Sequence, residues 1–252
     1  MSGFVEKGII RVHNHVGPDI WLMQIELPRI AKEAKPGQFV HVKVNDPRYI
    51  LRRPISIAGT DAGRGIVEII YRIVGKGTEA MSHLKVGDTL DCLGPLGTSF
   101  DMDKDHIVGI GGGVGIAPLL YFGQEIVRMG AKPTFLLGAR SESDLLELEE
   151  FCKLGRVLIT TEDGSAGEQG FVTNHSILQH ERFDQISTCG PNPMMKAVAR
   201  VATELGVRCE ASLENMMACG VGACLCCVEK TTEGNLCVCK EGPIFDVKRL
   251  LW

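Results

Sequence analysis

Six of the ten cysteines lie between positions 219 and 239, and their spacing is the strongest chemical signal in the chain. Cys219, Cys224 and Cys227 follow the C-x4-C-x2-C spacing typical of [2Fe–2S] sites, which take their fourth thiolate from further along the chain. Small residues at 220, 222 and 223 allow the backbone N–H groups of this loop to point at the sulfurs. The spacing therefore predicts an iron–sulfur cluster.

Zinc and reactive thiols are the alternative interpretations of these cysteines. The commonest structural zinc sites pair one C-x2-C with a second one or with two histidines, and neither combination occurs here. Residues 236–239 read as a short extended segment, which would place Cys237 and Cys239 on the same side, roughly 6–7 Å apart. Periodicity therefore leaves the fourth ligand open between Cys237 and Cys239, and with Cys226 the segment contains more thiols than the four that a cluster needs.

A second signal is the glycine-rich run at 111–115, which follows an apolar strand-like segment and precedes a helical one. Glycines at such a junction let the backbone approach a pyrophosphate, and the following helix N-terminus favours its charge. A tight turn without a ligand is the alternative. The sequence Cys-Gly-Pro-Asn-Pro at 189–193 ends a later strand, where open α/β sheets bind ligands. The candidate nucleotide-binding residues are Gly111, Gly112, Gly113, Gly115, Cys189 and Gly190.

A third group of candidates lies in the first hundred residues. Arg53 can pair with a phosphate, and Ser56, two residues after Pro54, can hydrogen-bond a ring; an edge strand with surface arginines is the alternative. Further on, Thr78 is predicted to cap a short helix at 79–84, whose start would suit a second phosphate. Simple capping is the alternative there.

These residues must be positioned by two domains, or by two domains and a small appendage, because the chain has 252 residues. Short β segments such as 39–44 and 65–71, separated by turns, predict an antiparallel barrel or sandwich over 1–100. Strands at 106–110, 134–137, 157–160 and 185–188 alternate with helices at 119–129, 143–153 and 193–205, which predicts a parallel α/β sheet over 101–211. Residues 212–252 are predicted to form a small metal module.

Composition excludes several classes of function. Hydrophobic residues make up 44% of the chain and charged residues 23%, so a folded protein is expected, and the net charge of −4 argues against a nucleic-acid partner. No secretory signal is visible, and the longest uncharged run, 107–124, contains six glycines and a proline, unlike a membrane span. We therefore expect a cytoplasmic protein. No nucleophile–base arrangement for hydrolysis is present, and no catalytic acid or base is assigned.

Taken together, these motifs resemble a known family. Arg-Pro-Ile-Ser at 53–56, Gly-Thr at 77–78 and the segments 111–118 and 189–193 occur in the order of the ferredoxin–NADP reductase superfamily. The cysteine module, ending at 238–245, resembles that of the electron-transfer subunits of NAD-dependent (type B) dihydroorotate dehydrogenases. The resemblance implies a FAD-binding barrel at 1–100, an NAD-binding domain at 101–211 and a [2Fe–2S] module at 212–252. The implied FAD-binding residues are Arg53, Pro54, Ile55, Ser56, Ile70, Tyr71, Arg72, Gly77 and Thr78, and the implied cluster ligands are Cys219, Cys224, Cys227 and Cys239.

The resemblance also implies a function in pyrimidine (UMP) biosynthesis. A partner subunit carrying FMN would oxidise dihydroorotate, and electrons would pass through the cluster and FAD of this chain to NAD+, in a heterotetramer of two plus two subunits. A related NAD(P)H:acceptor reductase subunit serving ferredoxin, sulfur compounds or a hydrogenase is the alternative enzyme. A non-catalytic iron–sulfur redox sensor is a third hypothesis, against which the intact motifs argue. NAD is favoured over NADP by the resemblance alone. The residues themselves leave the choice undecided, because Arg140, just after the strand at 134–137, could meet a 2′-phosphate.

One residue departs from the family pattern. Plant-type reductases have tyrosine where this chain has Ile55, so aromatic stacking on a flavin is lost at that point.

Overall fold

The structure is a computed structural model that describes residues 3–252. Contacts between residues divide the chain into two compact units. The first contains the described part of Met1–Ser99 together with Glu214–Glu229 and Asn235–Pro243. The second contains Phe100–Leu213, Lys230–Gly234 and Ile244–Trp252. The C-terminal segments therefore contribute residues to both units.

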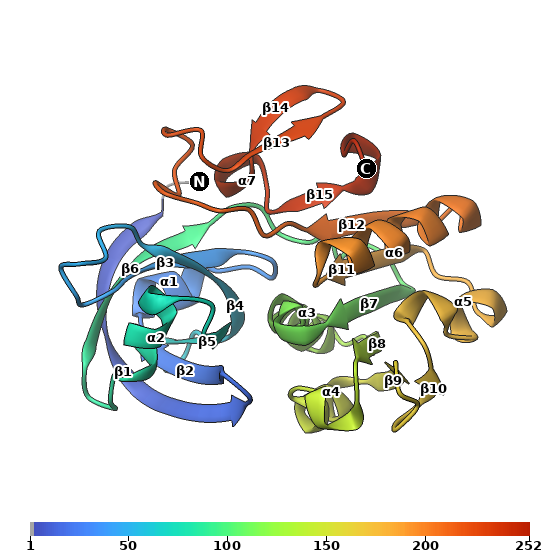
Figure 1. The fold of residues 1–252 in the computed structure, drawn as a ribbon, viewed down its shortest axis with the longest axis horizontal. Coiled ribbons are helices and arrows are strands. Elements are labelled where there is room, and N and C mark those ends of the chain that lie inside the picture. The colour runs from blue at the N-terminus through green and yellow to red at the C-terminus, as the bar shows by residue number, and fades with distance from the viewer. Residues whose placement is uncertain (1–2) are drawn as a thin grey trace. The chain divides into compact units, whose positions relative to one another are not determined.

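The first unit is built on a closed antiparallel barrel with the strand order β1-β2-β5-β4-β3-β6 (Figure 1). Cross-strand neighbours Ile25 and Val67, and likewise Ile57 and Ile69, are fully buried, so alternate side chains of each strand fill the barrel. The prediction of an antiparallel barrel is confirmed. Its elements are β1 (Phe4–Gly17), β2 (Ile20–Glu26), α1 (Pro28–Glu33), β3 (Phe39–Lys43), β4 (Arg53–Asp61), β5 (Ile66–Arg72), α2 (Lys76–Ser82) and β6 (Thr89–Leu96).

The second unit is built on a seven-stranded sheet with the order β10-β9-β8-β7-β11-β12-β15. All neighbours in it are parallel except β12 and β15, which are antiparallel. The predicted parallel α/β sheet is therefore confirmed. Its strands are β7 (Ile107–Gly112), β8 (Thr134–Ala139), β9 (Arg156–Thr161), β10 (Glu168–Gln169), β11 (Gln185–Cys189), β12 (Arg208–Ser212) and β15 (Ile244–Asp246).

Helices cover both faces of this sheet (Figure 1). On one face, Gly109 and Gly123 lie against Phe135, which lets α3 pack closely on the strands. On the other face, Ile110, Ile186 and Val198 belong to a buried apolar cluster beneath α6. The helical elements are η1 (Gly113–Ile116), α3 (Ala117–Arg128), η2 (Glu142–Asp144), α4 (Leu148–Leu154), η3 (Val172–Asn174), α5 (Ile177–His180), α6 (Asn192–Leu205) and η4 (Val247–Arg249).

The helix predicted at 143–153 begins later than the sequence suggests. The regular helix α4 starts at Leu148, after an extended Leu145 and after Glu147, which has a φ of 50°. A non-glycine residue in this left-handed region interrupts a right-handed helix. The apolar spacing that continued back to 143 therefore reflects packing of Leu146, which is buried, rather than helix.

The cysteine-rich segment has little regular structure. Residues 214–227 form bends, turns and irregular chain, with no helix or strand. They are followed by the two-stranded sheet of β13 (Val228–Thr231) and β14 (Gly234–Cys237) and by the single helical turn α7 (Val238–Glu241). Among residues 3–252, no helix combines the length and the apolar character that crossing a membrane requires.

Candidate cofactor sites

The loop at 219–227 folds so that its backbone N–H groups point at cysteine sulfurs. Gly220, Gly222 and Leu225 have φ values of 73°, 77° and 57°, and these left-handed residues curl the chain tightly. As a result, the N–H groups of Val221, Ala223 and Cys224 all donate to the Sγ atom of Cys219, each over 3.4 Å.

Two further backbone N–H groups donate to two other sulfurs of the site. The N–H of Gly222 donates to Cys239 Sγ over 3.1 Å, and the N–H of Cys239 donates to Cys227 Sγ over 3.4 Å. Five backbone donors are therefore directed at three of the four predicted ligands. Donors aimed at sulfur stabilise the negative charge of thiolates and of an iron–sulfur cluster.

The four sulfurs are arranged as two pairs. The side chains of Cys219 and Cys224 are hydrogen-bonded to each other, and so are those of Cys227 and Cys239. Among residues 3–252, no three His, Cys, Asp or Glu side chains surround a single metal position. Two pairs of thiolates fit a [2Fe–2S] cluster, in which each of the two irons takes two protein ligands.

The local electrostatics differ between the two pairs. Burial opposes ionisation of Cys219, but the hydrogen bonds from Val221, Cys224 and Ala223 outweigh it and lower the pKa of this thiol to about 6. Burial, together with the hydrogen bond to Cys227, raises the pKa of Cys239 to about 12. The thiolate form is therefore favoured at Cys219 and opposed at Cys239.

The predicted extended segment at 236–239 is confirmed for 236–237 and wrong for 238–239. Strand β14 ends at Cys237, whose N–H donates to Glu241 Oε2 over 2.8 Å, and Cys239 lies in the helical turn α7. The two thiols therefore are not related by strand periodicity. Cys239 contacts Cys227 and Gly222, whereas the thiol of Cys226 is exposed and donates to the carbonyl of Met216 over 3.5 Å.

Arg53, the first residue of the barrel strand β4, lies directly against the start of α2. A Cβ atom added to Gly77 would come within 2.2 Å of Arg53 Nε, so the absence of a side chain at 77 makes room for the guanidinium. The guanidinium carbon also lies 5.8 Å from the centre of the Tyr49 ring. This fixed cation beside a helical turn is suited to a pyrophosphate, the charged part of FAD.

Thr78 does not cap α2 in the predicted way. The helix begins at Lys76 with Gly75 as its N-cap, and Thr78 occupies the third helical position. Its hydroxyl accepts the N–H groups of Val74 and of the N-cap residue Gly75, over 3.0 and 3.3 Å. These hydrogen bonds give Thr78 a structural role at the helix start whether or not a phosphate is bound.

The remaining predicted flavin residues lie on neighbouring strands. Ile55 and Ser56 are half-buried on β4, and Arg72 is exposed at the end of β5. Tyr71 is 1% exposed, and its hydroxyl lies 2.9 Å from Nε2 of His13. Burial raises the pKa of Tyr71. The side chain of Tyr71 is thus engaged within the barrel.

In the second unit, the predicted nucleotide residues meet where the strand order of the sheet reverses. Strands β7 and β11 are neighbours, and Gly111 is the register partner of Cys189 at their carboxyl ends. A Cβ atom on Gly115 would lie 2.4 Å from the Cα of Gly190, so the two loops touch backbone to backbone. Open α/β sheets bind nucleotides at such a switch point.

The structure explains several of these glycines by packing. A side chain on Gly111 would meet Leu119 at 2.7 Å, and one on Gly115 would meet the Gly190 backbone. Gly113 differs, because it is half-exposed and has a φ of 56°. The sequence analysis assigned all four glycines to ligand approach, whereas in the structure Gly113 alone among them is partly exposed.

Sequence reasoning missed His41. This histidine lies on β3 within the first unit, is fully buried, and packs against Gly220 of the cysteine loop. The only local signal was a polar residue inside an apolar strand.

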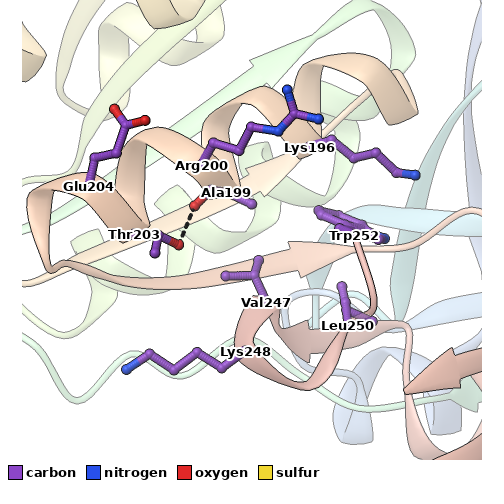
Figure 2. Close-up of a pocket in the computed structure, with 9 residues that line it drawn as sticks. All are labelled: Lys196, Ala199, Arg200, Thr203, Glu204, Val247, Lys248, Leu250 and Trp252. Atoms are coloured by element: carbon purple, nitrogen blue, oxygen red, sulfur yellow. Dashed lines mark hydrogen bonds between the residues drawn. The ribbon is translucent and has the colours of Figure 1, made fainter. Parts of the chain in front are cut away.

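A separate pocket of about 270 Å³ lies between α6 and the C-terminal residues of the second unit (Figure 2). Lys196, Arg200 and Lys248 give it a basic lining, and the Lys196 ammonium lies 5.9 Å from the centre of the Trp252 ring. It contains none of the residues that the sequence analysis singled out. The cofactor assignments therefore do not involve it.

Three family models match the chain. The "Iron-sulfur cluster binding domain of dihydroorotate dehydrogenase B" matches residues 214–251, the "Oxidoreductase NAD-binding domain" matches 110–200, and the "Oxidoreductase FAD-binding domain" matches 7–100.

Relatives of known name extend the match to the full length. The "Dihydroorotate dehydrogenase B (NAD(+)), electron transfer subunit" of Fusobacterium nucleatum subsp. nucleatum is 38% identical and covers 96% of each chain. The protein of the same name from Desulforamulus reducens is 38% identical over 100% of each chain.

Solved structures share the fold. The structure of an NADH-dependent reduced ferredoxin-NADP oxidoreductase, described in connection with flavin-based electron bifurcation, superposes with a TM-score of 0.89 at 32% identity, covering 97% of this chain and 90% of that one. A ferredoxin NADP+ reductase from Neisseria gonorrhoeae with bound FAD and NADP has a TM-score of 0.68 at 20% identity, over 80% and 92% of the two chains, and shows the fold alone.

Proposed function

Because the chain belongs to the family of dihydroorotate dehydrogenase B electron transfer subunits, we propose that it carries electrons from dihydroorotate oxidation to NAD+ in pyrimidine biosynthesis. It is an oxidoreductase subunit with domains for FAD, NAD and an iron–sulfur cluster. The observation that carries the proposal is the pairing of Cys219 with Cys224 and of Cys227 with Cys239, together with the five backbone N–H groups that donate to three of these sulfurs.

Bound FAD would exchange a hydride with NAD(H) and single electrons with a [2Fe–2S] cluster, which explains why sites for all three occur in one chain. Cys219 and Cys224 would hold one iron, and Cys227 and Cys239 the other. Arg53 would neutralise charge on the pyrophosphate of bound FAD, and the absence of a side chain at Gly77 leaves space for its guanidinium. The chain's residues position the groups and set their electrostatic surroundings, so none needs to act as an acid or a base.

The dinucleotide site would lie at the carboxyl ends of β7 and β11. There Gly113 is partly exposed, and the contact between Gly115 and Gly190 fixes the two loops that would receive the pyrophosphate. For the other residues of the two nucleotide sites, we propose the FAD-binding or NAD-binding roles that the family resemblance implies.

The partner is a catalytic subunit, as the name of the relatives implies. We propose that it carries FMN, that the complex contains two copies of each subunit, and that it works in the cytoplasm. The domain limits that we propose are 1–100 for FAD, 101–211 for NAD and 212–252 for the cluster.

Cofactor analysis of the chain tests the proposal. Protein purified without oxygen should contain one FAD, two irons and two acid-labile sulfides, and NADH should bleach its flavin absorbance. Zinc in place of iron, or an absorption spectrum without flavin, would contradict the assignment.

One observation favours a second candidate. The ferredoxin-NADP oxidoreductase structure is 32% identical over nearly the whole chain, which supports a related NAD(P)H:acceptor reductase subunit. That alternative predicts electron exchange with ferredoxin and no response to dihydroorotate when the native complex is assayed with both.

A further inference from the structure

His41 occupies an unusual position for a histidine. It lies in the middle of β3, where alternation places it on the same face as Phe39 and opposite Val40 and Val42. The side chain is 0% exposed, and its ring meets that of Phe39 edge-on, with 5.9 Å between the ring centres.

The cysteine loop closes over this ring. A Cβ atom on Gly220 would lie 2.7 Å from Nδ1 and 2.9 Å from Cε1 of His41, so the Nδ1 edge of the imidazole faces the Cα of Gly220. Gly220 also has a φ of 73° and directly follows Cys219. The imidazole is therefore the surface on which the first turn of the cluster loop rests.

Neither ring nitrogen of His41 has a hydrogen-bond partner among residues 3–252. A buried polar group without a partner costs about 1–3 kcal/mol, so such a group in a folded protein calls for an explanation such as a bound ion. Burial, assisted by the nearby Arg52 cation, lowers the pKa of His41 to about 4, which keeps the ring neutral with one N–H. Arg52 cannot be the partner, because its guanidinium donates to the His41 carbonyl and pairs with Asp91.

We propose that His41 is a positioning residue of the iron–sulfur site: its imidazole supports Gly220, and with it the backbone of Cys219, and its unpartnered N–H donates to a sulfur of the bound cluster. This rests on the proposed function, since it requires the cluster. A hydrogen bond to sulfur stabilises the additional negative charge of the reduced cluster and raises its reduction potential. A histidine that only filled space would be replaceable by an apolar ring of similar size.

The test compares variants of the full chain, purified without oxygen, by iron content, by the EPR spectrum of the reduced cluster and by its midpoint potential. His41→Phe keeps an aromatic ring but removes the N–H, whereas His41→Asn and His41→Gln keep an N–H donor. His15→Phe, at an exposed position on β1, is the control for loss of a histidine.

We expect His41→Phe to make cluster reduction about tenfold less favourable, a shift of about 59 mV to lower potential for one electron, with a changed EPR spectrum. At least one of the two amide variants should lie closer to the wild type, and His15→Phe should match it. If His41→Phe holds no iron but retains FAD, an amide variant that keeps the cluster supports the proposal.

Three results would overturn it: a wild-type potential and spectrum in His41→Phe, equal shifts in the phenylalanine and both amide variants, or loss of the cluster from all of them. None of these measurements uses dihydroorotate. A wild-type chain that contains no cluster would defeat the proposed function as well, whereas a cluster that is indifferent to His41 would defeat only this inference.

Discussion

Substitution of Gly115 by alanine provides a sharp test of the nucleotide site. The new Cβ atom would lie 2.4 Å from the Cα and 2.5 Å from the N of Gly190, and 2.8 Å from the carbonyl carbon of Cys189. All three are backbone atoms, so no flexible side chain can move aside. Overpacking typically costs about 1–3 kcal/mol, and contact with backbone places this site at the upper end, near 3 kcal/mol. At roughly 2–4 °C per kcal/mol for a chain of this size, the Tm should fall by about 6–12 °C.

The same displacement should separate the loops that follow β7 and β11 and so weaken NADH binding by about tenfold or more. Gly130→Ala is the matched control, because Gly130 follows the other end of α3, has a φ of 84° and has no atom within 4 Å of an added Cβ. It should lose about 1–2 kcal/mol from the left-handed backbone while NADH binding stays unchanged. Thermal unfolding and NADH titration of both variants measure these effects. A Gly115→Ala protein with wild-type Tm and NADH affinity would refute the backbone contact.

Further predictions concern the other sites. Cys239→Ser should abolish the [2Fe–2S] EPR signal and lower the iron content, while Cys226→Ser and Cys237→Ser leave both largely intact; the opposite result for 237 and 239 would move the fourth ligand. Arg53→Ala should reduce FAD retention at least tenfold, since a hydrogen bond to a charged group contributes about 1.5–3 kcal/mol, and unchanged flavin content would exclude Arg53 from the site. Gly77→Ala should reduce it in the same assay by displacing the guanidinium. Steady-state kcat/KM should favour NADH over NADPH, and the reverse preference would support the alternative reductase.

The barrel and the parallel sheet could be predicted because their signals are local. Alternating apolar residues at 39–44 and 65–71 became β3 and β5, and the glycine run after an apolar strand became the turn from β7 into α3. Likewise, the C-x4-C-x2-C spacing is itself a short-range constraint, so the loop at 219–227 was visible from residue types alone.

Features that depend on distant contacts or on special backbone angles could not be predicted. Glu147 has a left-handed φ that the neighbouring residue types do not indicate, so the start of α4 was misplaced. Cys239 lies in a helical turn because Glu241 accepts the N–H of Cys237. Strand periodicity gives no indication of this hydrogen bond. The role proposed for His41 depends on its contact with Gly220, which is far away in sequence.

The most direct test of the central claim is an assay of the complex purified from its native source through a tag on this chain, with dihydroorotate as the electron donor and NAD+ as the acceptor. Formation of NADH that depends on dihydroorotate, and that is lost when Cys224→Ser replaces the wild-type chain, is the result expected of a dihydroorotate dehydrogenase B electron transfer subunit. A complex that reduces NAD+ with ferredoxin but not with dihydroorotate would contradict the account.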